Sequence, residues 1–223
     1  TTRTVLRPKR VRVAEHVDTL LRDAALITAR IGRPDLHLLY LLAYTSTLWI
    51  QWDKREKIRG WLDVLVLGDS GQGKSTTFLA LQAWMGLGEY VVLKKATEAG
   101  LLGGRVEQGG RYWIQWGIDP RGDKRLVFYD EIKGTPTKTL AVLTAARSSG
   151  YAEFTLVDGH ARTHARTRRV WASNARTVGS DAVTMGDFGY PVLAIPRLWG
   201  SAEDVRRLDA ALCVVTGEVP IED

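Results

Sequence analysis

The sequence predicts an α/β fold in which helices sandwich a parallel sheet. Three short apolar runs have the length and composition of buried strands, at residues 62–67, 126–129 and 170–173. Segments with helical spacing of apolar residues lie between them, and strands that alternate with helices favour a parallel sheet. The 223 residues are enough for one such domain with a substantial core.

Composition narrows the class of protein. Hydrophobic residues make up 45% of the chain and charged residues 25%, as in an ordinary soluble globular protein, and the net charge of +6 permits nucleic acid as a partner. The single cysteine, Cys213, excludes an intrachain disulfide framework and a zinc site built from several cysteines. Because no apolar run approaches 18 residues, we expect no membrane span.

A glycine-rich turn after the first of these runs carries the phosphate-binding loop pattern G-x-x-x-x-G-K-[ST], and a helical segment follows it. Successive N–H groups of such a loop face an anion, the lysine reaches the β- and γ-phosphates, and the following hydroxyl holds Mg²⁺. A chance glycine-rich turn is the alternative. We therefore expect ATP and Mg²⁺ as ligands, bound by Gly68, Asp69, Ser70, Gly71, Gln72, Gly73, Lys74, Ser75 and Thr76.

Asp130 and Glu131 directly follow the apolar run 126–129. At the carboxyl end of a strand in a P-loop ATPase, the first acid holds Mg²⁺ and the second orients and deprotonates the attacking water. A solvated strand end is the usual explanation of such a pair. The order and distance from Lys74, however, suit the P-loop ATPases that carry an additional strand, so we predict a metal site at Ser75 and Asp130 and a catalytic base at Glu131.

Two further residues are candidates for the hydrolytic machinery. Asn174 ends the run 170–173, where a polar side chain helps to position the water in this class of ATPase; a simple turn residue is the alternative. An arginine supplied by a neighbouring subunit can neutralise charge on the γ-phosphate. Arg207 is our first choice for it, Arg206 the second and Arg197 the third, although surface arginines are normally solvated.

A hairpin is predicted around Asp158-Gly159, between β-prone residues. Alternation along the return strand places basic side chains on one face, which suits contact with a phosphate backbone. A solvated edge strand that is kept basic to prevent aggregation is the alternative. The side chains predicted to share this face are His160, Arg162, His164, Arg166 and Arg168.

Taken together, these motifs resemble the AAA+ ATPase domain of the minichromosome maintenance (MCM) replicative helicases. The likeness covers about residues 35–215, with all motifs in the family's order. It is carried by Arg59-Gly60 before LDVLVLGDSGQGKS, by TEAGL at 97–101, by VFYDE, by the hairpin, by VWASN and by RRLDAAL.

The resemblance implies an organisation of the chain. It implies a basic arm and helix at 1–34, an AAA+ core at 35–216 and a truncated linker at 217–223. Within the core, a helix-2 insert would occupy about 100–122 and a presensor-1 hairpin about 152–168.

The chain also departs from the family's pattern. Ala175 stands where proline usually follows the sensor asparagine, Ile132-Lys133-Gly134 follow the acidic pair, and His160 or Arg162 replaces the hairpin lysine. Only 16 residues follow Arg207, so we expect the helical lid to be missing. The resemblance thus suggests a divergent relative.

By this resemblance we expect a hexameric ring that unwinds DNA in replication, in the cytoplasm at the nucleoid. Arg105 and Arg111 of the insert would face the DNA together with the hairpin. An ATP-dependent switch or loader that remodels a protein–DNA complex is the alternative, although it would not need Glu131. A protein remodeller is a third class, which the polar insert tip disfavours.

Overall fold

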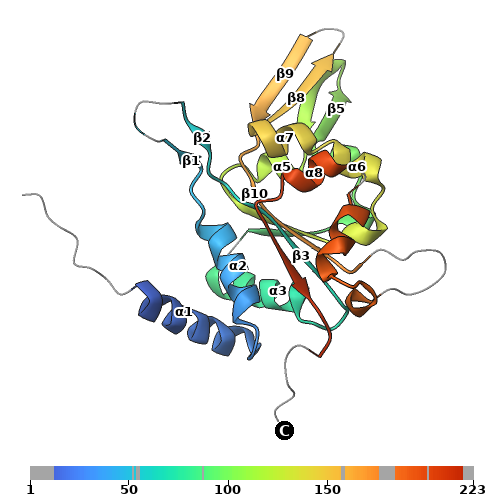
Figure 1. Cartoon of the computed structure of the whole chain (residues 1–223). Coiled ribbons are helices and arrows are strands. Elements are labelled where there is room, and N and C mark those ends of the chain that lie inside the picture. Colours follow the sequence, from blue (N-terminus) through green and yellow to red (C-terminus); the bar gives the residue numbers. More distant parts are fainter. Residues whose placement is uncertain are drawn as a thin grey trace, which may run out of the picture.

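A five-stranded parallel sheet forms the centre of the computed structural model, which describes residues 13–51, 53, 56–86, 88–156, 159–175, 184–199 and 201–217. The strands lie in the order β11–β3–β10–β7–β4 (Figure 1). The prediction of a parallel sheet is confirmed. The strand bounds are β3 (Asp63–Gly68), β4 (Glu89–Val92), β7 (Leu126–Asp130), β10 (Arg168–Ser173) and β11 (Ala210–Val214).

The middle strands are buried on both faces. Every residue of β3 and β7 is buried, as expected for parallel strands that helices cover on each side. Val170 of β10 lies opposite Val64 of β3 on one side and Phe128 of β7 on the other. β10 is therefore held between the strand that precedes the glycine-rich loop and the strand that ends in the acidic pair.

Helices cover both faces of the sheet. α1 (Val13–Thr28), α2 (Pro34–Thr45) and α3 (Lys74–Met85) cover one face, where Tyr40 and Phe78 pack against Phe128 of β7. On the other face, α6 (Thr137–Ala141), α7 (Thr144–Ser149) and the 3₁₀ segment Pro191–Arg197 lie over Trp171. Because α1 packs on α2 and α3, the helix of the predicted N-terminal segment belongs to the same body as the core.

Two hairpins project together from the sheet, at the top of Figure 1. One consists of β5 (Gly103–Gln108) and β6 (Arg111–Trp116), the other of β8 (Tyr151–Leu156) and β9 (Gly159–His164). The rings of Trp116 and Phe154 lie 5.6 Å apart and join the two. The hairpin predicted around Asp158-Gly159 is thus present, although Asp158 lies outside the described residues, and the segment predicted as an insert forms the other hairpin.

The structure corrects the predicted basic face of the hairpin. β9 ends at His164, so Arg166 and Arg168 do not share its basic face. α2 ends at Thr45, and the chain then continues to β1 (Trp49–Ile50), which pairs with β2 (Ile58–Arg59); the ring of Trp49 meets that of Trp61 edge to face. Two helices, α6 and α7, occupy the segment from Thr137 to Ser149.

The remaining helices are short. They are α4 (Glu98–Leu101), α5 (Ile118–Arg121) and α8 (Ala202–Arg206), with 3₁₀ turns at Leu93–Lys95, Ile132–Gly134 and Met185–Asp187. Within the described part of the chain, no helix combines the length and apolarity needed to cross a bilayer.

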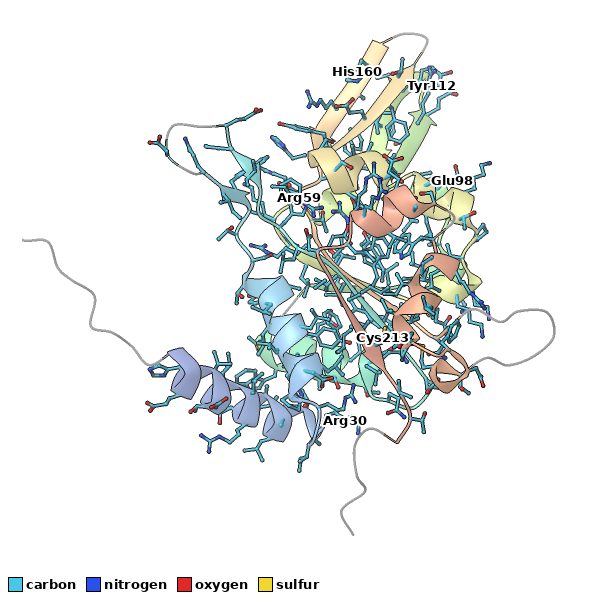
Figure 2. The ribbon with its side chains drawn as sticks, viewed as in Figure 1. Arg30, Arg59, Glu98, Tyr112, His160 and Cys213 are labelled. Carbon is cyan, nitrogen blue, oxygen red and sulfur yellow. The ribbon has the colours of Figure 1, made fainter. Side chains whose placement is uncertain are left out.

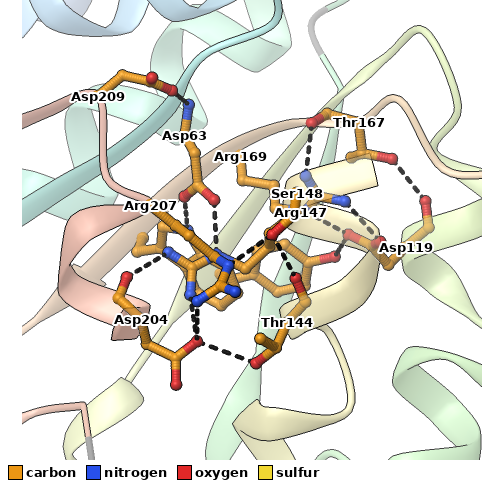
Figure 3. A network of polar contacts seen from close by, with 12 residues as sticks. Asp63, Asp119, Thr144, Arg147, Ser148, Thr167, Arg169, Asp204, Arg207 and Asp209 are labelled. Carbon is orange, nitrogen blue, oxygen red and sulfur yellow. Dashed lines mark hydrogen bonds and ion pairs between the residues drawn. The ribbon is translucent and has the colours of Figure 1, made fainter. Parts of the chain in front are cut away.

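Two buried ion pairs anchor the hairpins to the amino ends of the strands (Figure 3). Asp63 opens β3 and accepts a 2.6 Å bond from Nε of Arg147, which lies on α7 just before β8. Asp119 follows β6 and accepts two 2.7 Å bonds from the guanidinium of Arg169 in β10. Since all four side chains are fully buried, removal of one partner would leave an uncompensated charge in the core.

The turn between α1 and α2 gives a prediction about pH. Thr28 Oγ1 and His37 Nε2 lie 2.7 Å apart, and burial lowers the pKa of His37, against opposing effects of the Arg33 backbone and the Asp35 charge. The unfolded chain therefore binds this proton more readily than the folded chain. The stability that neutral His37 contributes is complete above a pH of about 6.5, and it is lost as the pH falls through the folded pKa.

We expect the free energy of unfolding to fall below pH 6.5 by at most about 1.4 kcal/mol per pH unit from this group. Urea denaturation between pH 5 and 7.5 measures it. His37→Gln should flatten this part of the profile, whereas His16→Gln, at an exposed position on α1, should not. An unchanged profile in His37→Gln would refute the assignment.

Candidate nucleotide site

The loop at residues 68–73 joins the carboxyl end of β3 to the start of α3. Gly71 and Gly73 have φ angles of +81° and +79°, a left-handed conformation that glycine adopts without strain. Gly68 is required for a different reason, because a Cβ there would lie 2.6 Å from the Val214 carbonyl oxygen of β11. The glycines thus serve both the curl of the loop and the close approach of two strands.

The loop forms one wall of a pocket of about 640 Å³. Residues 70–76 line it, together with Asp130, Glu131 and Asn174. Asp69, although part of the predicted set, turns its carboxylate away, and the backbone N–H groups of Met185 and Thr216 donate to it. The structure therefore brings together the predicted loop, the acidic pair and the strand-end asparagine around one cavity.

Lys74 lies buried in the middle of this arrangement. Its Nζ donates to the backbone oxygens of Gly68 (2.9 Å) and Asp69 (2.6 Å) and to Oδ1 of Asn174 (2.9 Å). Burial lowers the pKa of Lys74 to about 8, and the charges of Asp130 and Asp69 partly offset this effect. Since all three acceptors are uncharged, no ion pair neutralises the ammonium group within this set of contacts.

Asp130 organises the hydroxyl groups around it. Its Oδ2 accepts 2.5 Å bonds from the Ser75 and Tyr90 hydroxyls, and its Oδ1 accepts from the Glu131 backbone N–H. Burial and the hydrogen bond to Asp130 raise the pKa of Tyr90 to about 12, so this hydroxyl stays protonated and donates. No sequence pattern indicated Tyr90, which is an ordinary strand residue of β4.

Hydroxyl and carboxylate oxygens are ligands that Mg²⁺ accepts in proteins. The described residues contain no cluster of three His, Cys, Asp or Glu side chains suited to a metal. A Mg²⁺ site that is shared with nucleotide phosphates and water does not need one, because it uses one or two protein oxygens. Ser75 and Asp130 therefore fit that kind of site.

Glu131 has an unusual backbone for a non-glycine residue, with φ +59°. Such a conformation costs about 1 kcal/mol or more and persists where the surrounding structure fixes it, often at functional sites. The chain leaves β7 at this point, and Glu131 is exposed on the pocket wall. No other described residue forms a hydrogen bond or ion pair with its carboxylate.

The three predicted arginines differ in their surroundings, and Figure 3 shows those of Arg207. Arg207 is held within its own chain, because Nε donates to Ser148 Oγ at 2.6 Å and Nη2 to Glu203 Oε1 at 2.5 Å. Arg206 is exposed, and none of the described residues pairs with it. Arg197 lies over the ring of Phe188.

The residues predicted to contact nucleic acid also differ in their surroundings. Arg166 forms a bidentate ion pair with Asp123 at the base of the hairpin, with Nε and Nη2 donating at 2.9 and 2.7 Å. Arg162 on β9 is half exposed, pairs with Glu153 at 2.7 Å and stacks on Tyr151. Arg166 therefore has a structural role in this chain, while Arg162 keeps access to solvent.

The other members of the set lie on the projecting hairpins, where Figure 2 shows His160 and Tyr112. His160 and His164 are exposed on β9, and the ring of His164 lies 4.8 Å from that of Tyr151. Arg111 is exposed at the start of β6, and Arg105 stacks on Tyr112 at 3.9 Å. These side chains are gathered at the end of the molecule away from the phosphate-binding loop.

Sequence patterns did not indicate three further cations on the pocket wall. They are Arg30, from the turn after α1, and Lys94 and Lys133, which follow β4 and β7. None belongs to a recognisable motif, so only the fold brings them to the site.

Comparison of the chain with models of protein families gives no match. A search among curated proteins also finds no significant similarity.

Proposed function

We propose that this protein is an ATPase of AAA+ type, similar to the MCM helicases, which binds ATP with Mg²⁺ in the 640 Å³ pocket and hydrolyses it. One observation carries the proposal. The ends of β3, β10 and β7, three adjacent parallel strands, bring Lys74, Asn174 and Asp130-Glu131 to the same pocket. β10 supplies the additional strand between the loop strand and the acidic strand, as the class requires.

The chemistry follows from the side chains. Lys74 would place its charge on the β- and γ-phosphates in place of the neutral oxygens that it now contacts. Ser75 and Asp130 would hold Mg²⁺, which supplies charge neutralisation for the phosphate oxygens. Glu131 would accept a proton from the attacking water, and Asn174, which lines the same pocket and would be released by Lys74, would orient that water.

The hairpins support DNA as the partner. They present cationic side chains and exposed aromatic rings together, with Tyr112 52% and Trp113 44% exposed. A crevice of about 260 Å³ between the hairpins is lined by Tyr112, Trp113 and His160. Aromatic faces beside cations suit single-stranded DNA, whose unpaired bases can stack on them. We therefore propose a hexameric motor that surrounds DNA and acts at the nucleoid.

The first prediction tests the catalytic base. Glu131→Gln should keep MgATP affinity, because the backbone loop and Lys74 remain, but lower turnover by about 100-fold or more through loss of the proton acceptor. Phosphate release and nucleotide titration measure the two quantities. Lys74→Ala should lose nucleotide binding itself, and Glu56→Gln, an exposed carboxylate between β1 and β2, should change neither. Full turnover in Glu131→Gln would exclude this mechanism.

A second prediction concerns the arginine supplied by a neighbour. The structure favours Arg206 over Arg207, because Arg207 is already bound within its own chain. Arg206→Ala should lose turnover and keep ATP affinity, while Arg207→Ala should mainly lower the melting temperature. In the wild type, the rate per subunit should rise with protein concentration and with single-stranded DNA.

An assay of two mixed variants provides the decisive control. Lys74→Ala subunits retain Arg206, and Arg206→Ala subunits retain an intact pocket, so a mixture should regain activity that neither variant has alone. No recovery, together with a concentration-independent rate, would favour a switch or loader over a ring motor. Loss of turnover in Arg207→Ala at unchanged stability would return the role to Arg207.

The third prediction concerns DNA binding by the hairpins. Replacing Arg111 and Arg162 with Ala should weaken binding to single-stranded DNA and reduce the slope of log affinity against log salt by about 0.7 for each phosphate that is no longer neutralised. Fluorescence anisotropy over a salt series measures this slope. Arg166→Ala should instead lower stability by about 2 kcal/mol, because it breaks charged hydrogen bonds to Asp123. An unaltered salt slope in the double variant would remove the hairpins from the DNA interface.

A further inference from the structure

We infer that Arg30, in the turn between α1 and α2, holds the α-phosphate end of the bound nucleotide. The inference rests on the proposed ATP site and adds to it a residue outside the sequence motifs. It makes the N-terminal helix pair a part of the nucleotide pocket rather than a separate arm.

Arg30 lies directly against the phosphate-binding loop. Its Nη2 donates to Thr76 Oγ1 at 3.1 Å, and its Cδ and Nε lie 3.3 and 3.4 Å from the place that a Cβ on Gly73 would occupy. It lines the same pocket as Lys74 and Asp130. The guanidinium group therefore rests on the last glycine of the loop and on the first turn of α3.

The orientation of the pocket indicates which phosphate of the nucleotide Arg30 would contact. Ser75 faces Asp130 and the carboxyl ends of the strands, which is the end for Mg²⁺ and the γ-phosphate. Thr76, one residue later on α3, instead faces α1 through its bond to Arg30. Loop N–H groups cradle the α- and β-phosphates, and the lysine reaches the β and γ groups, so the Arg30 side of the loop is the α side. Lys94, by contrast, lies against Gly134 beside the acidic pair.

The turn is fixed so that Arg30 points toward the loop. Ala29 has a left-handed backbone with φ +51°, and the hydrogen bond between Thr28 and His37 closes the turn onto α2. α2 is fastened in turn to the loop, since the Tyr40 hydroxyl donates to the Lys74 carbonyl oxygen at 2.8 Å. Arg30 itself is exposed, and among the described residues no carboxylate forms an ion pair with it. Its guanidinium therefore keeps donors for an anion.

Titrations with ATP, ADP and inorganic pyrophosphate test which phosphate Arg30 contacts. Arg30→Ala should weaken ATP and ADP binding by the same factor, about tenfold for one charge-assisted contact, because both nucleotides carry the α-phosphate. Inorganic pyrophosphate can occupy the loop without a nucleoside, so Arg30→Ala should change the affinity for pyrophosphate little. Calorimetric titration of all three ligands measures these changes. Arg30→Lys should recover part of the nucleotide affinity.

Arg22→Ala serves as the matched control, because Arg22 is an exposed arginine of α1, the helix before the Arg30 turn, and it bonds only to residues one turn away. This variant should bind all three ligands as the wild type does. A thermal melt of Arg30→Ala checks that α1 stays folded, and Thr76→Val, which removes the Arg30 anchor by another route, should also weaken ATP and ADP equally.

The outcomes separate the proposed function from the role of Arg30. If wild-type protein binds no nucleotide, the proposed function fails. If it binds, but Arg30→Ala matches it, the assignment of Arg30 is wrong. Loss of affinity for ATP but not for ADP would place Arg30 at the γ-phosphate. An equal loss of affinity for pyrophosphate would show that Arg30 attracts any anion in the pocket. Either result overturns the α-phosphate contact.

Discussion

The burial of β10 between β3 and β7 is the constraint on which the rest of the structure depends. Register fixes Val170 opposite both Val64 and Phe128, so the carboxyl ends of the three strands lie at the same edge of the sheet, within about two residues of one another. Only this alignment lets Asn174 reach Lys74 and lets Ser75 reach Asp130, contacts of 2.9 and 2.5 Å. A shift of one residue would also exchange the side chains that a strand packs against the two helical layers.

The same three strands connect the pocket to the hairpins. Asp63 of β3 and Arg169 of β10 lie near the amino ends of their strands and hold α7 and α5 through the buried ion pairs. α7 also carries Ser148, which binds Arg207 beside the exposed Arg206. The candidate nucleotide pocket and the projecting hairpins thus lie at opposite ends of the same strands, with the candidate trans arginine at the hairpin end.

The parts that the sequence predicted are those that depend on local signals. Apolar runs indicate the strands, the glycine pattern indicates the loop, and acids after a strand indicate the candidate metal ligands. Where contacts between residues far apart in the sequence decide the position of a side chain, the prediction was incomplete or wrong. Arg166 fits the alternation of a basic strand, yet Asp123, 43 positions earlier in the chain, binds it at the hairpin base. Tyr90 and Arg30 lie beside the loop only because the sheet order and the α1–α2 turn bring them there.

The balance of charge in the pocket explains why the cationic residues outside the sequence motifs matter. Four cationic side chains, Arg30, Lys74, Lys94 and Lys133, face two carboxylates, Asp130 and Glu131. The motif residues alone would set one lysine against two acids, a poor environment for a polyphosphate. Arg30 and the two outer lysines come from separate segments, which follow α1, β4 and β7. The positive excess therefore belongs to the assembled fold, and it suits a polyphosphate that carries its own Mg²⁺.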